Sequence, residues 1–346
     1  MSRHPTPDFR VTLDGKDLTS TIEPRLQSLS ITECRQDEAD TLDLTLDDHD
    51  NRLAIPKRGA VLEVAIGWAG EQLVNKGKFT VNEVEVGGAP DYITIRARSA
   101  SMTKGMGERQ EKSWHGQTLG AIVRAIAARH ALKPAVDATL AAVTIPHIDQ
   151  TQESDMSFLT RLAKRFDAVM TVKNQSLLFM PIGKGRTSSG RTLTALTIAR
   201  GDGDQHRYHV SERETYAGVR AYWHSNTEGE RKEVTIGGEN NNNLKKLPEV
   251  YPNEDEARRA ATAEWQRVQR SQATMSYSLA MGRAEIFPEL PVSVSGFKPE
   301  IDATPWLVKQ VRHSIGDSGF TSSLELEVRD DPTTDKHKGR LRAGGK

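Results

Sequence analysis

Ser154-Asp-Met-Ser-Phe-Leu-Thr-Arg-Leu-Ala-Lys-Arg-Phe166 is the most informative stretch of this 346-residue sequence. Its apolar residues recur at intervals of three and four, which predicts an amphipathic helix over 155–166. Ser154 is suited to cap the first turn, and Asp155 complements the positive end of the helix dipole. The stretch therefore places a helix in the middle of the chain.

The segments on either side of this helix extend it into an α+β unit. Apolar residues at helical spacing predict an earlier helix over 118–130. Directly after residue 166, Ala168–Lys173 and Ser176–Pro181 predict a hairpin around Asn174-Gln175. We therefore expect an α+β domain over residues 106–185.

The residues before this unit are typical of β structure. Leu42, Leu44 and Leu46 alternate with polar residues, which places the leucines on one face of a strand. Similar short segments recur up to residue 100, separated by turns rich in Gly, Pro, Asn and Asp. This spacing predicts a first antiparallel, barrel-like β domain over residues 1–105.

The residues after the α+β unit predict a second barrel-like β domain over 186–330. A Gly-, Ser- and Thr-rich stretch over 183–203 spans the boundary between the two domains, and we expect it to be a linker or exposed loop. One helix over 254–270 interrupts the strands, with Asn253 and Glu256 forming its capping box. A basic tail without periodicity occupies 331–346. The predicted fold class is mainly β with an α+β insert.

Composition excludes several classes of protein. The 47 basic and 47 acidic side chains balance, which argues against wholesale binding to nucleic acid or to an anionic membrane. No apolar stretch is long enough to span a membrane, and no secretory signal is evident, so we expect a soluble protein made in the cytoplasm. The single cysteine, Cys34, excludes an internal disulfide and is expected to be buried in a strand. Aromatic residues make up only 5%, a lean content that favours burial against partner proteins.

Candidate catalytic motifs each have a simpler interpretation. Gly316-Asp317-Ser318-Gly319 matches the nucleophile motif of chymotrypsin-like proteases, but strand patterns flank it and favour a hairpin turn. His206 and His209 are expected in an exposed loop rather than at a metal ion. The eight carboxylates between Glu33 and Asp50 are expected to form a solvated acidic strand edge. We therefore predict no catalytic, cofactor-binding or metal-binding residues and no small-molecule substrate.

A family resemblance appears between Trp114 and Phe179. The residues that carry it are Trp114, Thr118-Leu119-Gly120, Ile122-Val123, Ile126-Ala127, His130, Leu132, Gln152-Glu153-Ser154-Asp155, Phe158-Leu159 and Arg161-Leu162-Ala163. This pattern resembles the phage late control D family and the N-terminal hub part of VgrG spike proteins. The strands near the N-terminus and the ending Trp306–Arg329 are also similar to that family, so the resemblance covers nearly all of residues 5–330.

The resemblance implies a structural role at the tip of a contractile tail. Such proteins form a homotrimer at the centre of the baseplate, between the tail tube protein and the central spike protein, in contact with other baseplate proteins. The implied location is the virion, after assembly in the host bacterial cytoplasm. VgrG chains continue into a β-helical needle, whereas this sequence has no such repeats, so we expect a separate spike protein.

Two other functions remain open from the sequence. One is a tail-associated enzyme that degrades peptidoglycan, because injection machines must breach the cell wall. The other is a carbohydrate- or receptor-binding module, for which the low aromatic content provides few stacking platforms. Neither alternative is supported by a motif in the chain.

Overall fold

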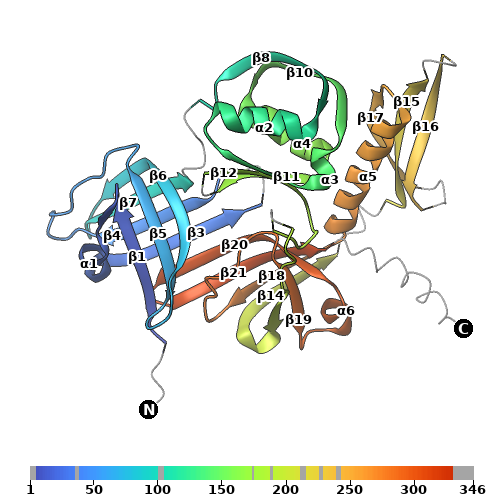
Figure 1. The fold of residues 1–346 in the computed structure, drawn as a ribbon. Coiled ribbons are helices and arrows are strands. Elements are labelled where there is room, and N and C mark those ends of the chain that lie inside the picture. The colour runs from blue at the N-terminus through green and yellow to red at the C-terminus, as the bar shows by residue number, and fades with distance from the viewer. Residues whose placement is uncertain are drawn as a thin grey trace, which may run out of the picture.

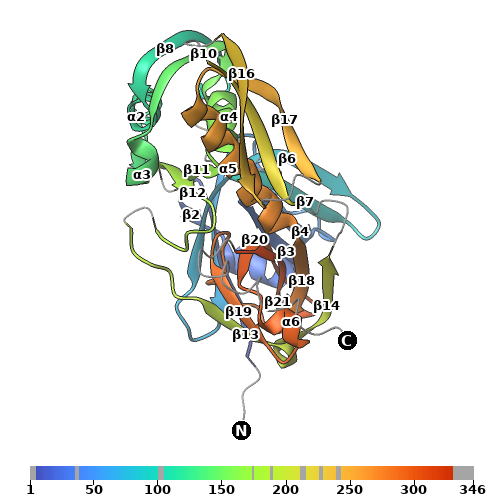
Figure 2. The ribbon, with the colours of Figure 1, turned by 90° about the vertical axis from the view of Figure 1, so that its right-hand side faces the viewer.

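The computed structural model describes residues 5–35, 39–99, 105–173, 175–187, 190–210, 216–225, 229–238 and 243–329. Strands dominate and their pairing is mostly antiparallel, so the predicted mainly β class with an α+β middle is confirmed. Figure 1 shows the first β region at the left, the second at the lower centre and an α+β unit above the second region. A smaller helix-and-sheet unit lies beside the α+β unit (Figures 1 and 2). The tail over 331–346, predicted to be basic and irregular, lies outside the described residues.

The first β region is a curved antiparallel sheet in the strand order β3-β4-β7-β6-β5-β1-β2. The alternation read from the sequence determines its core, because Leu42, Leu44 and Leu46 of β4 are all buried. The elements are β1 (Pro7–Leu13), β2 (Lys16–Asp17), α1 (Thr19–Ile22), a 3-10 turn (Glu23–Arg25), β3 (Leu26–Cys34), β4 (Thr41–Asp47), β5 (Val61–Trp68), β6 (Val74–Gly87) and β7 (Tyr92–Ser99).

The α+β unit packs two helices between a two-stranded ribbon and a three-stranded sheet (Figure 1). Both predicted helices form where expected and begin at capped residues. The Ser154 hydroxyl accepts a hydrogen bond from the Ser157 amide at 3.1 Å, and Thr118 caps the earlier helix in the same way. The elements are β8 (Arg109–Thr118), α2 (Leu119–Arg129), β9 (Lys133–Val136), α3 (Ala138–Ala141), β10 (Thr144–Ser154), α4 (Asp155–Arg165), β11 (Ala168–Lys173) and β12 (Ser176–Pro181).

The second β region contains strands that the sequence interpretation assigned to a linker. Residues 196–199 form β13, which pairs in parallel with β19, and Ile198 is fully buried there. The prediction of a linker over all of 183–203 is therefore wrong for its last part, because one buried isoleucine is enough to anchor a short strand. The elements are β13 (Leu196–Ala199), a 3-10 turn (Arg200–Asp202), β14 (Gly203–Val210), β18 (Ala273–Leu279), β19 (Pro291–Ser295), α6 (Pro299–Asp302), β20 (Trp306–Gly316) and β21 (Gly319–Val328).

A small helix-and-sheet unit with its own core is inserted into the second β region. Its strands β15 (Gly218–Ser225), β16 (Glu230–Gly237) and β17 (Leu244–Tyr251) pack against α5 (Glu254–Ser271). Asn253 caps α5 through the Glu256 amide at 2.9 Å, as the capping box predicts. The core consists of Val219, Ala221, Val234, Ala257 and Ala261. Residues 186–330 thus contribute to more than one core.

Pairing between β3 and β20 joins the two β regions into one 13-stranded sheet. The tip of the β20–β21 hairpin also enters the first core, where Ile315 and Phe320 are buried. Trp68 packs on Phe320 with ring centroids 5.3 Å apart, and its indole N–H donates to the Gly282 carbonyl at 2.9 Å. The two β regions are therefore held as a single rigid body. None of the helices in the described part of the chain is long and apolar enough to cross a membrane.

Candidate functional site

The motifs considered as catalytic occupy structural positions. Gly316 pairs with Gly319 across the β20–β21 turn, so Asp317 and Ser318 form the hairpin turn predicted for them. His206 and His209 are exposed, but they lie in strand β14 rather than in a loop, because this segment pairs with β18. No group of three or more His, Cys, Asp or Glu side chains is placed to hold a metal ion among the described residues.

The acidic segment is the main error of the sequence interpretation. β3 and β4 lie inside the sheet rather than at its edge, and Glu33, Asp40 and Asp48 are buried. Asp48 accepts hydrogen bonds from the amides of Arg52 and Leu53 at 3.0 and 2.9 Å, which explains its burial. Glu33 and Asp40 are buried for a different reason, because their carboxylates lie beside basic side chains from other parts of the fold.

Glu33 is the centre of the first part of a buried ionic cluster. Its carboxylate lies 2.6 Å from the Lys76 ammonium of β6 and 3.5 Å from the Lys173 ammonium of β11. Lys173 also lies 3.2 Å from Asp40. One hairpin of the α+β unit is thereby fixed to the first β region by charge pairs that are largely shielded from water.

The environment of this cluster changes the pKa values of its members. Burial raises the pKa of Glu33, but His313, Lys76 and Lys173 outweigh burial and bring this pKa to about 2. Burial lowers the pKa of His313. Its Nδ1 atom shares a hydrogen bond of 2.8 Å with the Ser322 hydroxyl. A neutral His313 beside a charged Glu33 is consistent with both directions. The Glu33 carboxylate is therefore charged near neutral pH.

Arg35 begins the second part of the cluster, which reaches the remaining units. Its guanidinium contacts the carboxylates of Glu289 and Glu327. Glu327 of β21 lies 3.3 Å from Arg270 of α5, and Arg270 donates to Asp167 at 2.7 Å. Asp167 sits between α4 and β11, so this chain of charges crosses from the first β region to the α+β unit.

We call these ten side chains the junction cluster, because every unit of the fold contributes to it. Removing a charged member would leave its partners with less compensation in a low-dielectric environment. The cluster thus fixes the relative positions of the units. Its members are Glu33, Arg35, Asp40, Lys76, Asp167, Lys173, Arg270, Glu289, His313 and Glu327.

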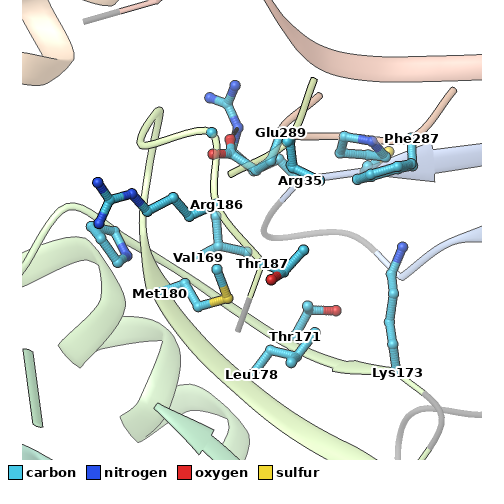
Figure 3. A pocket seen from close by; sticks show the side chains of 15 residues that line it. Arg35, Val169, Thr171, Lys173, Leu178, Met180, Arg186, Thr187, Phe287 and Glu289 are labelled. Carbon is cyan, nitrogen blue, oxygen red and sulfur yellow. Dashed lines mark ion pairs between the residues drawn. The ribbon is translucent and has the colours of Figure 1, made fainter. Parts of the chain in front are cut away.

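A pocket of about 230 Å³ opens beside the junction cluster (Figure 3). Val169, Leu178 and Met180 form an apolar wall, and Arg35 and Glu289 lie on the opposite side. Cys34 also lines the pocket; it lies in a strand, β3, as predicted, but it is half-buried rather than buried. The nearby cations Arg35 and Lys173 are already paired with carboxylates, so the pocket is part of the joint between units.

The sequence contained one signal for the junction cluster that its interpretation missed. Glu33 and Arg35 continue the alternation of Leu29 and Ile31, so they occupy positions on the buried face of β3. A charged residue at an apolar-face position indicates a buried ion pair. Its partners were not identifiable, because Lys76 and Lys173 are far away in the sequence.

Comparison with known proteins gives this fold a family. Residues 39–319 match the model of the phage tail baseplate hub (GPD) family. The "probable baseplate hub protein" of Escherichia phage P2 is 45% identical over an alignment that covers 94% of each chain. The corresponding protein of Escherichia phage 186 is 42% identical, with 93% of each chain covered.

Solved structures share the fold at much lower identity. A tail protein from Neisseria meningitidis MC58 superposes with a TM-score of 0.71 at 15% identity, covering 93% of this chain and 96% of that one. A chain of the Francisella PdpA–VgrG complex superposes with a TM-score of 0.57 at 9% identity, covering 94% of this chain and 58% of that one. The predicted resemblance to late control D proteins and to VgrG hubs is confirmed. The chain belongs to the phage tail baseplate hub family.

Proposed function

We propose that this hub protein assembles as a homotrimeric ring that joins the tail tube to the central spike. Membership of the baseplate hub family places the chain in the phage tail. The threefold ring, the tube and spike contacts and assembly in the host cytoplasm are the parts that we add. The peptidoglycan-degrading alternative is not advanced, since no observation favours it.

The observation that carries the proposal is the 13-stranded sheet that unites the two β regions. A ring that transmits force between tube and spike needs stiff subunits, and the β3–β20 pairing supports this because it continues one hydrogen-bonded sheet from the first β region into the second. The junction cluster adds the α+β unit to the same body. Each subunit would therefore present two rigid β regions to its neighbours.

Exposed strand edges give these subunits a means of association. β14 lies at one end of the 13-stranded sheet, and β18 is its one neighbour among the described strands. Its last residue, Val210, is 55% exposed. An open edge with an exposed valine suits pairing with a strand of a second chain. A closed ring would satisfy these edges by rotation.

Light scattering coupled to size-exclusion chromatography tests the ring. A trimer has three times the 38.3 kDa mass of one chain. We expect this mass for the purified protein alone, or three copies of the chain per particle when tail tube protein is needed for assembly. Electron microscopy of the same sample should show threefold particles. A monomeric mass at high concentration, with no ring after tube protein is added, contradicts the proposal.

A pair of lysine variants separates edge pairing from general surface effects. Val210→Lys places a charge on the open edge of β14 and should reduce the trimer fraction. Ile55→Lys is the control, because Ile55 is an exposed apolar side chain that lies outside the strands. Equal effects of the two variants would remove β14 from the proposed contact. Incubation of the purified chain with peptidoglycan should release no muropeptides.

A further inference from the structure

Two histidines face each other on the exposed ribbon of the α+β unit. His115 of β8 and His147 of β10 are directly paired across the ribbon. Their Nδ1 atoms are 2.9 Å apart and their ring centroids 4.5 Å apart. Both side chains are exposed, and His147 is 51% exposed. Neither residue contributes to the core or to the junction cluster, so packing does not require imidazoles here.

Asp149 fixes which nitrogen of His147 carries the proton. The Asp149 carboxylate lies 3.1 Å from His147 Nε2. The oxygens of an aspartate carboxylate accept hydrogen bonds and do not donate them. His147 Nε2 must then donate, which leaves a lone pair on Nδ1 directed at His115. This is the carboxylate–imidazole arrangement that orients histidine ligands of metal ions.

We propose that His115 and His147 form a binding site for a divalent transition-metal ion, with Cu²⁺ preferred and Ni²⁺ next. Both Nδ1 atoms would bind the ion. At present the Nδ1–H group of His115 donates a hydrogen bond to Nδ1 of His147. That proton moves to Nε2 of His115, so the neutral pair binds the ion without a net change in its own protons. The remaining coordination positions would be filled by water or by groups of another chain.

The distance between the two Nδ1 atoms bears on which metal ions the pair can bind. With metal–nitrogen bonds of about 2.05 Å, two ligands at a right angle are separated by about 2.9 Å. Tetrahedral ligands on Zn²⁺ are separated by about 3.3 Å, which would require the two rings to move apart. The observed 2.9 Å is the length of the hydrogen bond that now joins the two nitrogens, and it lets both bind Cu²⁺ or Ni²⁺ at adjacent square-planar positions without moving apart. The general order of divalent metal affinity points the same way.

The site is a two-ligand site, which limits its strength. Within the described residues, no third His, Cys, Asp or Glu joins the pair in a group placed to hold a metal ion. Asp149 is engaged with the far nitrogen of His147 and orients it without binding the ion. We therefore expect reversible binding, and the inference is independent of the proposed ring.

Calorimetric titration of the tag-free full-length chain with CuCl₂, NiCl₂ and ZnCl₂ tests the site. We expect affinity in the order Cu²⁺, Ni²⁺, Zn²⁺. In a His4→Ala background, which removes a competing Cu²⁺ ligand close to the terminal amine, His147→Ala should abolish the tightest Cu²⁺ binding step, and His115→Gln should do the same with a different side chain. Asp149→Asn should weaken Cu²⁺ binding about tenfold, the effect typical of losing such an orienting group.

His49→Ala is the matched control. His49 is exposed and lies 2.7 Å from an aspartate carboxylate, but its partner is Asp47 rather than a second imidazole. This variant should leave the Cu²⁺ isotherm unchanged. Circular dichroism establishes that each variant is folded before titration. Unchanged Cu²⁺ affinity in both folded His115→Gln and His147→Ala would overturn the proposal, and a preference for Zn²⁺ would overturn its geometry.

Discussion

Glu33 and Lys76 show, at the scale of single residues, how a charge in the core is tolerated. Both side chains are more than nine-tenths buried, and each is the nearest opposite charge of the other. Burial lowers the pKa of Lys76, and the carboxylate opposes this shift. Such a pair contributes little compared with apolar residues of equal volume, but breaking it is costly.

We predict that Lys76→Met lowers the free energy of unfolding by about 3 kcal/mol, because Glu33 is left buried with only the more distant Lys173. The double variant Glu33→Leu/Lys76→Met should recover most of this loss, since no unpaired charge then remains between them. Urea denaturation measures both. Lys78→Met, on the exposed face of the same strand, is the control and should change stability by less than about 0.5 kcal/mol.

The low pKa of Glu33 predicts a specific response to acid. In the folded protein its pKa is about 2, against 4.5 ordinarily, so the unfolded chain takes up the proton first as the pH falls. The stabilisation is therefore complete above about pH 4.5 and is lost between pH 4.5 and 2. We expect the difference in unfolding free energy between the natural chain and Glu33→Gln to shrink over that window by up to about 3 kcal/mol. A difference that is constant from pH 5 to pH 2.5 would contradict this assignment.

Helix α2 shows, at the scale of elements, how closely two helices approach in the α+β unit. A Cβ atom added to Gly120 would lie 2.8 Å from the Ala141 Cβ and 3.0 Å from its backbone. Alanine is a better helix former than glycine by about 1 kcal/mol, but a contact this short forces α3 to move.

We therefore predict that Gly120→Ala lowers the melting temperature, with a loss of about 1–3 kcal/mol because overpacking outweighs helix propensity. Gly201→Ala is the control, because Gly201 lies in a 3-10 turn and an added Cβ there would contact nothing within 4 Å. Scanning calorimetry of the two variants gives the comparison. A Gly120→Ala chain as stable as the Gly201→Ala chain would show that α3 yields freely.

The helices and the β11–β12 hairpin were predictable because each buries a periodic apolar face. The ribbon of β8 and β10 was not, since most of β8 is exposed and has no alternation to read. Strand β17 was also missed, because Pro248 interrupts it and only its partner strand β15 defines it. Local patterns therefore predicted elements that pack on a core, and they missed elements defined by a neighbouring strand.

At the scale of the whole molecule, the sequence indicated the composition of the units but not how they are joined. The β3–β20 pairing links residues near 30 with residues near 313, and neither strand has a local feature that selects the other. The buried contact between Arg35 and Glu327 also joins distant parts of the sequence, and neither residue has a local feature that identifies the other. Both joints are long-range, and they are what makes the hub one body.

These joints predict an uneven distribution of stability across the molecule. In the described residues, the core of the β15–β17 and α5 unit contains five buried hydrophobic side chains, whereas that of the first β region contains twenty. The small unit is held to the rest by Arg270 on Asp167 and by Arg165 on Glu256. Local opening is easiest where few apolar contacts must be broken.

Hydrogen exchange followed by mass spectrometry should therefore show faster exchange in β15–β17 than in β20–β21. Arg270→Met should accelerate exchange in the small unit further, because it leaves the buried Asp167 without its partner. Arg258→Met, which removes only an exposed pair within α5, should leave the exchange pattern unchanged. Because the first and second β regions share a sheet, their strands should exchange together in all three proteins. Separate exchange of β4 and β21 in the natural chain would mean that the β3–β20 pairing does not unite the two regions, and the rigid subunit on which the proposed ring depends would have to be abandoned.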